Sequence, residues 1–189
     1  QNEAIISEAF DLVELYEEDA GPLFINSRTE SGIPRNDQSG LELDWAMFQV
    51  QQGLIDYAYT PENLKRYSNI LDGAKFETAE YFPGDVAPPS DPTSSYEVEI
   101  DCSMPEVWWG EPVMFSEDTA RRPTGAYLAP GSIATVTVPS SLVNKGFRIR
   151  VGAHSWDLSK KPRYKRLHRV SLTYPINSTE TKIANPLGG

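Results

Sequence analysis

The chain has 189 residues, 39% hydrophobic and 23% charged, so it is long enough to bury a core without disulfides or metal ions. Its formal net charge is −10; residues 1–94 carry 18 acids and 5 bases, whereas residues 95–189 carry 9 acids and 12 bases. The acidic first half argues against nucleic acid as the main partner, and no stretch is long and apolar enough for a membrane span.

Apolar residues recur every three or four positions in the first seventy residues, which is the helical period. A first helix is predicted over Glu3–Glu18, because Gly21-Pro22 ends the pattern. A polar loop is expected at residues 26–40, and a second, largely buried helix follows it at residues 41–57. Thr60-Pro61 then predicts an N-cap and the first residue of a third helix.

Residues 83–95 contain four prolines and few hydrophobic residues, which is typical of a semi-stiff connector. We therefore expect a helical unit at residues 1–82, a linker at 83–95 and a second domain at 96–189. Because Cys102 is the only cysteine, no intrachain disulfide can form. We expect its thiol to be buried, since free cysteine behaves as a small hydrophobic residue.

The periodicity changes after the linker, where short segments alternate between apolar and polar residues as half-buried strands do. These segments are Tyr96–Ile100, Ala134–Val138, Phe147–Val151 and Val170–Tyr174. Turn residues such as Pro130-Gly131 separate them. The predicted fold class is therefore α+β, with an N-terminal helical segment followed by an antiparallel β-sandwich of Ig-like or jelly-roll type.

Neither a metal site nor a catalytic device is expected within this chain. The two histidines, His154 and His168, are fourteen residues apart with no glutamate between them, unlike a zinc helix. His154 is expected at a strand end and His168 on a basic surface. Ser155 and Asp157 flank His154 closely, but adjacent residues on a strand point to opposite faces.

Three tryptophans are candidates for sugar binding, because a flat aromatic ring covers the C–H face of a pyranose. The candidate glycan-binding residues are Trp108, Trp109, Trp156, Glu106 and Asp157. Core packing is the alternative for each ring. Because Trp108 and Trp109 are adjacent and would face opposite ways on a strand, at least one of them is expected at the surface or at an interface.

A cationic run is a second candidate site. It consists of Lys160, Lys161, Arg163, Lys165, Arg166 and Arg169. An anionic glycan or a phosphate group is one possible ligand for such a basic patch. The alternatives are a solvated loop between two strands and intramolecular pairing with the acidic helical half.

Four ordered motifs in the second half resemble the start of the enhancin-like, or peptidase M-sixty-like, zinc metallopeptidases. They are Pro123–Gly131, Val136–Pro139, Arg148–His154 and Thr181–Gly189. The resemblance covers about residues 96–189 and does not extend to the helical half.

The resemblance implies a secreted or cell-surface peptidase that cleaves heavily glycosylated proteins such as mucins. Its catalytic domain would carry zinc on a His-Glu-x-x-His helix after Asn185–Gly189, so no zinc ligand or catalytic residue is assigned to this chain. The expected partners are that catalytic domain and glycans of host or dietary glycoproteins. The expected docking residues are Tyr127, His154, Arg148 and Arg150.

Two functions therefore compete. In the first, the chain is a non-catalytic accessory domain that orients the catalytic domain on its substrate. In the second, it is a carbohydrate-binding module that uses its exposed aromatic side chains. A peptidase activity of the chain itself is a distant third.

Overall fold

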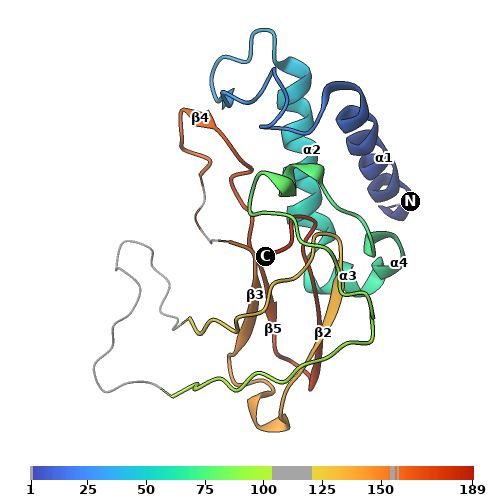
Figure 1. Ribbon diagram of the computed structural model, residues 1–189, viewed down its shortest axis with the longest axis vertical. Helices are drawn as coiled ribbons and strands as arrows, with labels where there is room; N and C mark the ends of the chain where they lie inside the picture. The colour runs from blue at the N-terminus through green and yellow to red at the C-terminus, as the bar shows by residue number, and fades with distance from the viewer. Residues whose placement is uncertain (1, 104–120, 154–155, 157) are drawn as a thin grey trace. The chain divides into compact units, whose positions relative to one another are not determined.

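The computed structural model of the protein describes residues 2–103, 121–153, 156 and 158–189 (Figure 1). The chain divides into two compact units, one made of Gln1–Pro88 together with Leu128–Gly189 and the other of Pro89–Tyr127. The first unit contains all the helices and strands that we describe here.

The α-helices of the described residues lie in the first half of the chain. They are α1 (Asn2–Ala20), α2 (Glu42–Ala58), α3 (Pro61–Arg66) and α4 (Ser68–Leu71), and a 3-10 turn, η1 (Glu77–Glu80), follows them. The three predicted helices are thus confirmed, the third being divided between α3 and α4. Thr60 caps α3 as expected, since its hydroxyl accepts a hydrogen bond from the Asn63 N–H at 3.3 Å.

The two long helices lie side by side (Figure 1). α1 buries Ile6, Val13 and Tyr16 on one face, as the helical period predicts. α2 buries a broader face that includes Phe48 and Ile55. α1 and α2 thus cover each other and still leave apolar side chains for the rest of the core.

The strands are short and pair antiparallel in three two-stranded sheets. They are β1 (Ile33–Pro34), β2 (Ile133–Thr137), β3 (Arg148–Val151), β4 (Arg163–Tyr164), β5 (Leu172–Pro175) and β6 (Glu180–Ala184), and a 3-10 turn, η3 (Ser140–Leu142), follows β2. β1 pairs with β4, β2 with β6 and β3 with β5. In the longest ladder Ala134 lies opposite Ile183.

The mixed helix and sheet content agrees with the predicted class, but the β-sandwich is not confirmed. The predicted strands near residues 134, 147 and 170 correspond to β2, β3 and β5. β6 and the two-residue strands β1 and β4 were not predicted. Tyr96–Ile100, predicted as a strand, has no strand partner among the described residues, and Tyr96 is 72% exposed.

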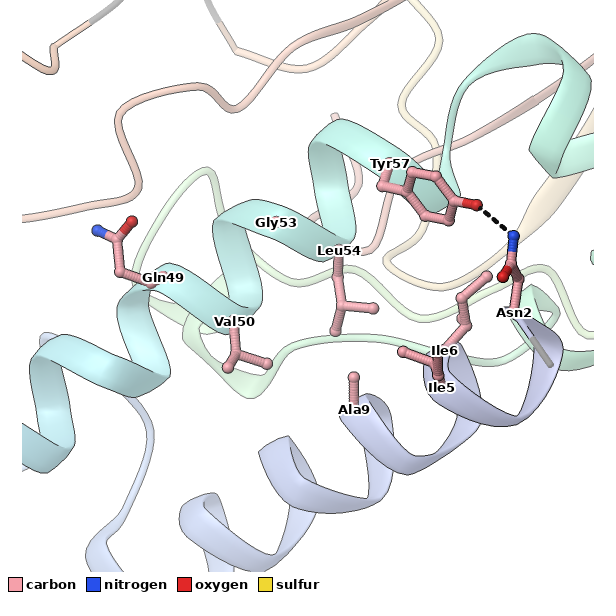
Figure 2. A pocket seen from close by; sticks show the side chains of 9 residues that line it. All are labelled: Asn2, Ile5, Ile6, Ala9, Gln49, Val50, Gly53, Leu54 and Tyr57. Atoms are coloured by element: carbon pink, nitrogen blue, oxygen red, sulfur yellow. Dashed lines mark hydrogen bonds between the residues drawn. The ribbon is translucent and has the colours of Figure 1, made fainter.

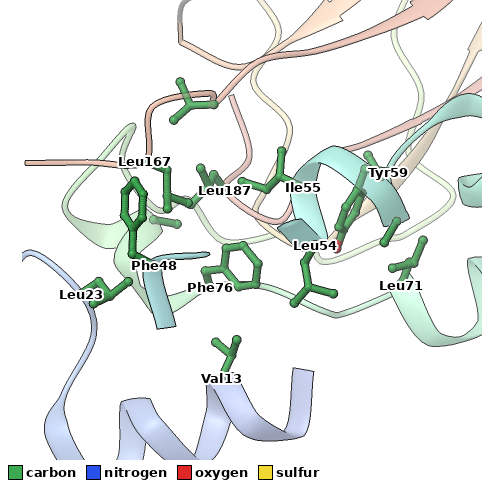
Figure 3. Packing of buried hydrophobic residues seen from close by; sticks show 14 of the residues in the cluster. Val13, Leu23, Phe48, Leu54, Ile55, Tyr59, Leu71, Phe76, Leu167 and Leu187 are labelled. Carbon is green, nitrogen blue, oxygen red and sulfur yellow. The ribbon is translucent and has the colours of Figure 1, made fainter. Parts of the chain in front are cut away.

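One hydrophobic core joins the helices to the strands of the first unit (Figure 3). Figure 3 shows Phe76 and Ile55 beside Leu187, which follows β6 and is fully buried. Residues 1–88 and 128–189 thus belong to one unit, whereas the sequence predicts separate domains at residues 1–82 and 96–189 with a linker at 83–95. The physical reason is that the short strands cannot enclose a core by themselves and pack on the apolar faces of the helices.

The described residues of the second unit, 89–103 and 121–127, are all exposed. Local hydrogen bonds shape this segment: Arg122 donates to the carbonyl oxygens of Asp101 and Ser103 at 2.9 and 3.0 Å. Cys102 is exposed, so the expected buried thiol is wrong. The preceding segment, Tyr96–Ile100, is exposed and is not in a strand, so Cys102 is not carried into a core.

Candidate functional site

The Asn185–Gly189 motif follows β6 and makes close contacts with several other backbone segments. The Asn185 side chain is completely buried, and its amide donates to the carbonyl oxygens of Val170 at 3.0 Å and Val151 at 3.4 Å. The side-chain Oδ1 of Asn185 accepts a hydrogen bond from the Leu187 N–H at 2.9 Å. One side chain thus ties β3 and the approach to β5 to the segment after β6.

Glycines allow the backbone of this motif to lie close to neighbouring backbone segments. Gly189 exchanges two backbone hydrogen bonds with Leu128, at 2.7 and 3.0 Å. A Cβ on Gly188 would lie 2.5 Å from the Leu128 carbonyl oxygen, and one on Gly189 would lie 2.5 Å from the Cα of Gly152. No other residue fits either position without displacing backbone.

Two of the other motifs that carry the resemblance, Pro123–Gly131 and Arg148–His154, contact the Asn185–Gly189 motif or the residues that it binds. Gly131 donates its N–H to the Asn185 carbonyl at 3.3 Å and accepts from Gly73 at 2.8 Å. Gly152, from the Arg148–His154 motif, lies against Val170 and Ser171 so closely that an added Cβ would be 2.3 Å from the Val170 carbonyl oxygen. We use the name motif clasp for residues 128–131, 151–152 and 185–189.

A second contact region joins α2 to the cationic run. The Gln52 side-chain amide exchanges two hydrogen bonds with the backbone of Arg169, each 3.1 Å long. The Arg169 guanidinium also pairs with the Asp56 carboxylate, as the intramolecular alternative for this run expects. Trp45, Phe48 and Tyr164 stack in the same region, with ring centroids 4.9 to 5.8 Å apart.

His168 belongs to this packed region, so its expected place on a basic surface is wrong. It is buried, and its ring centroid lies 5.3 Å from that of Phe48 and 5.7 Å from that of Tyr164. The flanking Leu167 and Val170 are also buried, and they were the sequence signal for this placement.

The other cationic side chains of the run differ in their contacts. Arg163 donates to the Gly32 carbonyl at 2.6 Å, and the Arg166 guanidinium lies 4.4 Å from the centroid of the Phe82 ring. Lys160, Lys161 and Lys165 are exposed. A ligand role for the basic patch stays a prediction and would rest on these three lysines.

Of the candidate glycan-binding residues, the structure places Trp156, whose side chain is 50% exposed. The other four candidates, Trp108, Trp109, Glu106 and Asp157, lie outside the described residues.

The expected docking residues do not form a described cluster. Tyr127 is exposed and belongs to the second unit. Arg148 is exposed and Arg150 half-buried on β3 of the first unit. His154 lies outside the described residues. Their proposed role in docking therefore stays a prediction.

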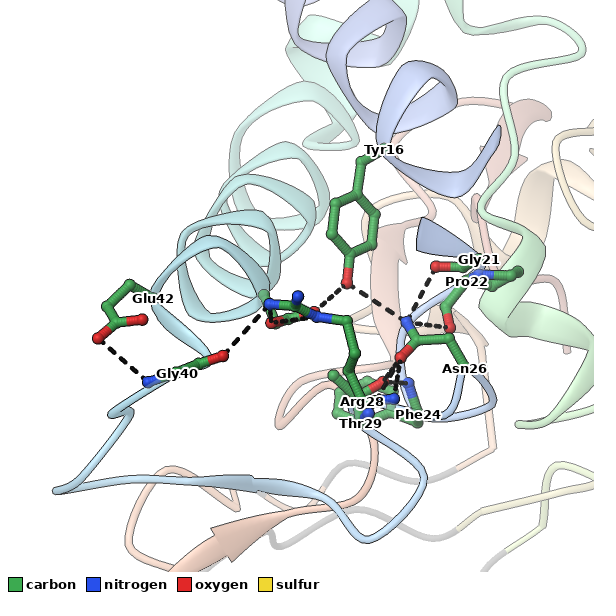
Figure 4. A network of polar contacts seen from close by, with 10 residues as sticks. Tyr16, Gly21, Pro22, Phe24, Asn26, Arg28, Thr29, Gly40 and Glu42 are labelled. Atoms are coloured by element: carbon green, nitrogen blue, oxygen red, sulfur yellow. Dashed lines mark hydrogen bonds and ion pairs between the residues drawn. The ribbon is translucent and has the colours of Figure 1, made fainter. Parts of the chain in front are cut away.

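A polar network holds the loop after α1 against the start of α2 (Figure 4). Asp44 is fully buried and accepts hydrogen bonds from the Tyr16 hydroxyl at 2.6 Å and from Arg28, with which it forms an ion pair at 2.7 Å. Asn26 donates to the Tyr16 hydroxyl at 3.3 Å. Burial opposes ionisation of Asp44, but the hydrogen bonds from Arg28 and Tyr16 outweigh it and lower the pKa of the carboxyl.

Glu17, which follows Tyr16 on α1, is a second acid with a shifted pKa, and its side chain is partly buried. Its carboxylate accepts hydrogen bonds from the Gln51 side chain at 3.1 Å and from the Glu77 N–H at 3.3 Å. Burial raises the pKa of Glu17 from 4.5 to about 7, and the nearby Glu77 carboxylate adds to the increase. Lys75, which pairs with Glu77 at 3.0 Å, only partly offsets it.

Glu17→Gln is expected to stabilise the protein at pH 8 and to have little effect at pH 5. The pKa of Glu17 is raised in the folded state, so its contribution to stability is fully present below pH 4.5 and is lost as the pH rises through 7. Because this side chain is only partly buried, the expected gain at pH 8 is about 1–2 kcal/mol. Urea unfolding at both pH values measures it.

The exposed neighbour on the same helix, Glu18, provides the control for this substitution. Glu18→Gln removes the same charge without relieving a buried group. A gain for Glu17→Gln that is equal at pH 5 and pH 8, or a matching gain for Glu18→Gln, would contradict the assignment.

No metal centre is present among the residues that the structure describes, since they contain no group of three or more histidine, cysteine, aspartate or glutamate side chains able to hold an ion. His168 packs between aromatic rings. Within the same described ranges, no helix is both long and apolar enough to cross a membrane.

The residues that carry the family resemblance thus meet in the motif clasp. The chain belongs to the family described as the N-terminal domain of M60-like peptidases, whose family model matches residues 90–189. This match confirms the resemblance inferred from the four motifs and begins within the predicted linker. It assigns the chain to a non-catalytic, N-terminal region of such peptidases.

One curated relative extends over part of the same chain. A TRPM8 channel-associated factor homolog from Xenopus laevis is 35% identical over 72 residues, which are 38% of this chain and 8% of that protein. The matched part of the chain is thus a small fraction of that relative's length. No solved structure matches the chain.

Proposed function

We propose that this chain is the accessory region of a secreted or cell-surface zinc metallopeptidase and orients the catalytic domain on glycoprotein substrates such as mucins. The observation that carries the proposal is the motif clasp. The residues by which the family resemblance is recognised are used for backbone contacts, and the contacts described within the clasp involve no ionised side chain. Such residues favour a rigid support over a reactive site.

The catalytic domain of the same polypeptide is the proposed partner, and the zinc ion is proposed to be bound there. A polypeptide that carries both parts tests the proposal. Its cleavage of a mucin-type glycoprotein is compared with that of a form lacking residues 1–189. We expect at least a tenfold loss of kcat/KM on the glycoprotein, with cleavage of a short unglycosylated peptide largely retained.

The comparison of the two substrates is the control, because misfolding of the shortened form would abolish both activities. Equal kcat/KM values on the glycoprotein for the two forms would overturn the proposal. Zinc-dependent proteolysis by residues 1–189 alone would overturn it as well.

The exposure of Trp156 favours carbohydrate binding as a second candidate function. Trp156→Ala is then expected to weaken binding of mucin-type oligosaccharides about tenfold, because the packing of the C–H face of a sugar ring on an aromatic face contributes much of the affinity. Titration calorimetry measures it. Tyr81→Ala is the control, since Tyr81 is 48% exposed and lies outside the candidate residues; equal losses for both variants, or no binding at millimolar sugar, would exclude this candidate.

A further inference from the structure

An open groove of about 330 Å³ runs between α1 and α2 (Figure 2). In Figure 2, Ile5 and Ala9 of α1 face Val50 and Leu54 of α2. The other lining residues are Asn2, Ile6, Gln49, Gly53 and Tyr57. Asn2 donates a hydrogen bond to the Tyr57 hydroxyl at 3.0 Å across one end, and most of the other lining side chains are apolar.

Gly53 is the unexpected residue in the groove. It lies in the interior of α2, where glycine destabilises a helix relative to alanine. A Cβ at this position would meet nothing within 4 Å, and the backbone has no positive φ that would require glycine. The described fold therefore does not explain the missing side chain, whereas close approach of a ligand to the backbone of α2 at this position would.

The apolar surface continues beyond the groove along both helices. Ile5, Leu12 and Leu15 of α1 are exposed, Ile5 by 58% and Leu15 by 63%. Their spacing of seven and three residues places them along one side of the helix. Leu43 and Tyr57 of α2 are exposed as well. This surface is about as long as α1, which at 1.5 Å per residue is about 28 Å.

Acidic residues accompany this apolar surface. Glu8 lies between Ile5 and Leu12 at helical spacing, and Asp19 follows Leu15 by one turn. Over its whole length α1 has seven acidic side chains and no basic one. On α2, Glu42 precedes the exposed Leu43. It lies two helical turns before Gln49, which lines the groove.

We propose that the α1–α2 groove binds a cationic amphipathic helix, with its apolar face over Gly53 and its lysine or arginine side chains against the acidic rim. An antiparallel helix pair with small residues at its centre offers the ridge-and-groove surface that a third helix needs. The acidic rim supplies the complementary charge. This inference concerns a different surface from the motif clasp and is independent of the proposed accessory function.

The charge also argues against two other occupants. A second copy of the chain would bring its own acidic α1 against this rim, so like charges would face each other. An anionic membrane surface would be repelled in the same way.

The test uses the full chain and a synthetic helical peptide of about 18 residues, with leucine on one face and lysine elsewhere. Gly53→Leu fills the groove and improves the helix propensity of α2, so the variant is expected to keep or raise its melting temperature. It is expected to raise the Kd of the peptide at least about tenfold, measured by fluorescence anisotropy. Ala4→Leu adds the same side chain to an exposed position that does not line the groove, and less than about a twofold change is expected.

A charge-reversal pair tests the rim. Glu8→Lys is expected to weaken binding several-fold, whereas Glu14→Lys, about two and a half turns from Ile5 on the opposite side of α1, is expected to have a much smaller effect. Equal Kd values for the Gly53→Leu and Ala4→Leu variants would overturn the proposal, as would equally tight binding of a peptide with glutamate in place of lysine. It would also be overturned by a dimer of the chain that Gly53→Leu dissociates, or by binding to vesicles of anionic lipid that Gly53→Leu abolishes.

Discussion

Gly152→Ala is expected to cost about 4 kcal/mol of unfolding free energy or to prevent folding. Gly152 has a φ of +119°, which an L side chain rarely adopts, and an added Cβ would lie 2.3 Å from the Val170 carbonyl oxygen and 2.7 Å from the Cα of Ser171. These are backbone atoms of the segment that the Asn185 amide also holds, so relieving the overlap would open the motif clasp. Urea unfolding followed by tryptophan fluorescence and circular dichroism measures the loss.

Gly146→Ala separates the effect of backbone strain from that of steric overlap. Gly146 also has a positive φ, +84°, but a Cβ there would meet nothing within 4 Å. The expected cost is therefore only about 1–2 kcal/mol, which is that of a left-handed conformation. Similar losses for the two variants would contradict the close packing of the clasp.

The helical half of the fold follows from local sequence signals. The 3.6-residue period, Gly21 after α1 and the Thr60-Pro61 start of α3 all act within a few residues of one another. Predictions from these signals agree with the structure because a helix makes its hydrogen bonds inside one segment.

The strands were harder to predict because their partners are distant in sequence. β6 begins Glu180-Thr181-Lys182, which has no apolar alternation, and its pairing with β2 joins residues almost fifty positions apart. β1 and β4 have two residues each, too few for a period. A sandwich was expected because each strand was assumed to pack on other strands, whereas residues such as Leu187 pack on the helices.

In the candidate site, too, the important residues could be identified from the sequence, but their contacts with distant residues could not. The motif Asn185–Gly189 was identified from its residues, but its role depends on Val151 and Val170, which are 34 and 15 positions away. His168 was assigned to a basic surface from its cationic neighbours. The apolar neighbours Leu167 and Val170 indicate burial of this segment, but the contact of His168 with Phe48 depends on the packing of α2, which is distant in sequence.

Asp44→Ala is the second substitution with a large expected effect, about 2–4 kcal/mol at neutral pH. It removes the acceptor of the buried Tyr16 hydroxyl and the partner of Arg28, and it leaves a cavity at a fully buried position. Asp44→Asn keeps the volume and is expected to cost less, about 1–2 kcal/mol. Thermal and urea unfolding at pH 7 measure both losses.

Arg28→Met provides the test of the ion pair itself. It leaves a buried carboxylate without its cation, so we expect destabilisation at pH 7 that is relieved in acid, where Asp44 takes up a proton. Adding Asp44→Asn to Arg28→Met should then restore stability at pH 7. A double variant less stable than Arg28→Met by the full cost of Asp44→Asn alone would show that the two side chains are not coupled.

The two acids of this region, Asp44 and Glu17, affect stability with opposite dependence on pH. The pKa of Asp44 is lowered below 3.8, so its contribution to stability is present above that value and is lost as the pH falls through the folded-state pKa. The pKa of Glu17 is raised to about 7, so its contribution is lost as the pH rises through that value. From these two groups, the unfolding free energy is therefore expected to be highest between the ordinary pKa values of the two carboxyls, 3.8 and 4.5. Glu17→Gln should move this maximum toward neutral pH, and Asp44→Asn should flatten the decrease on the acid side.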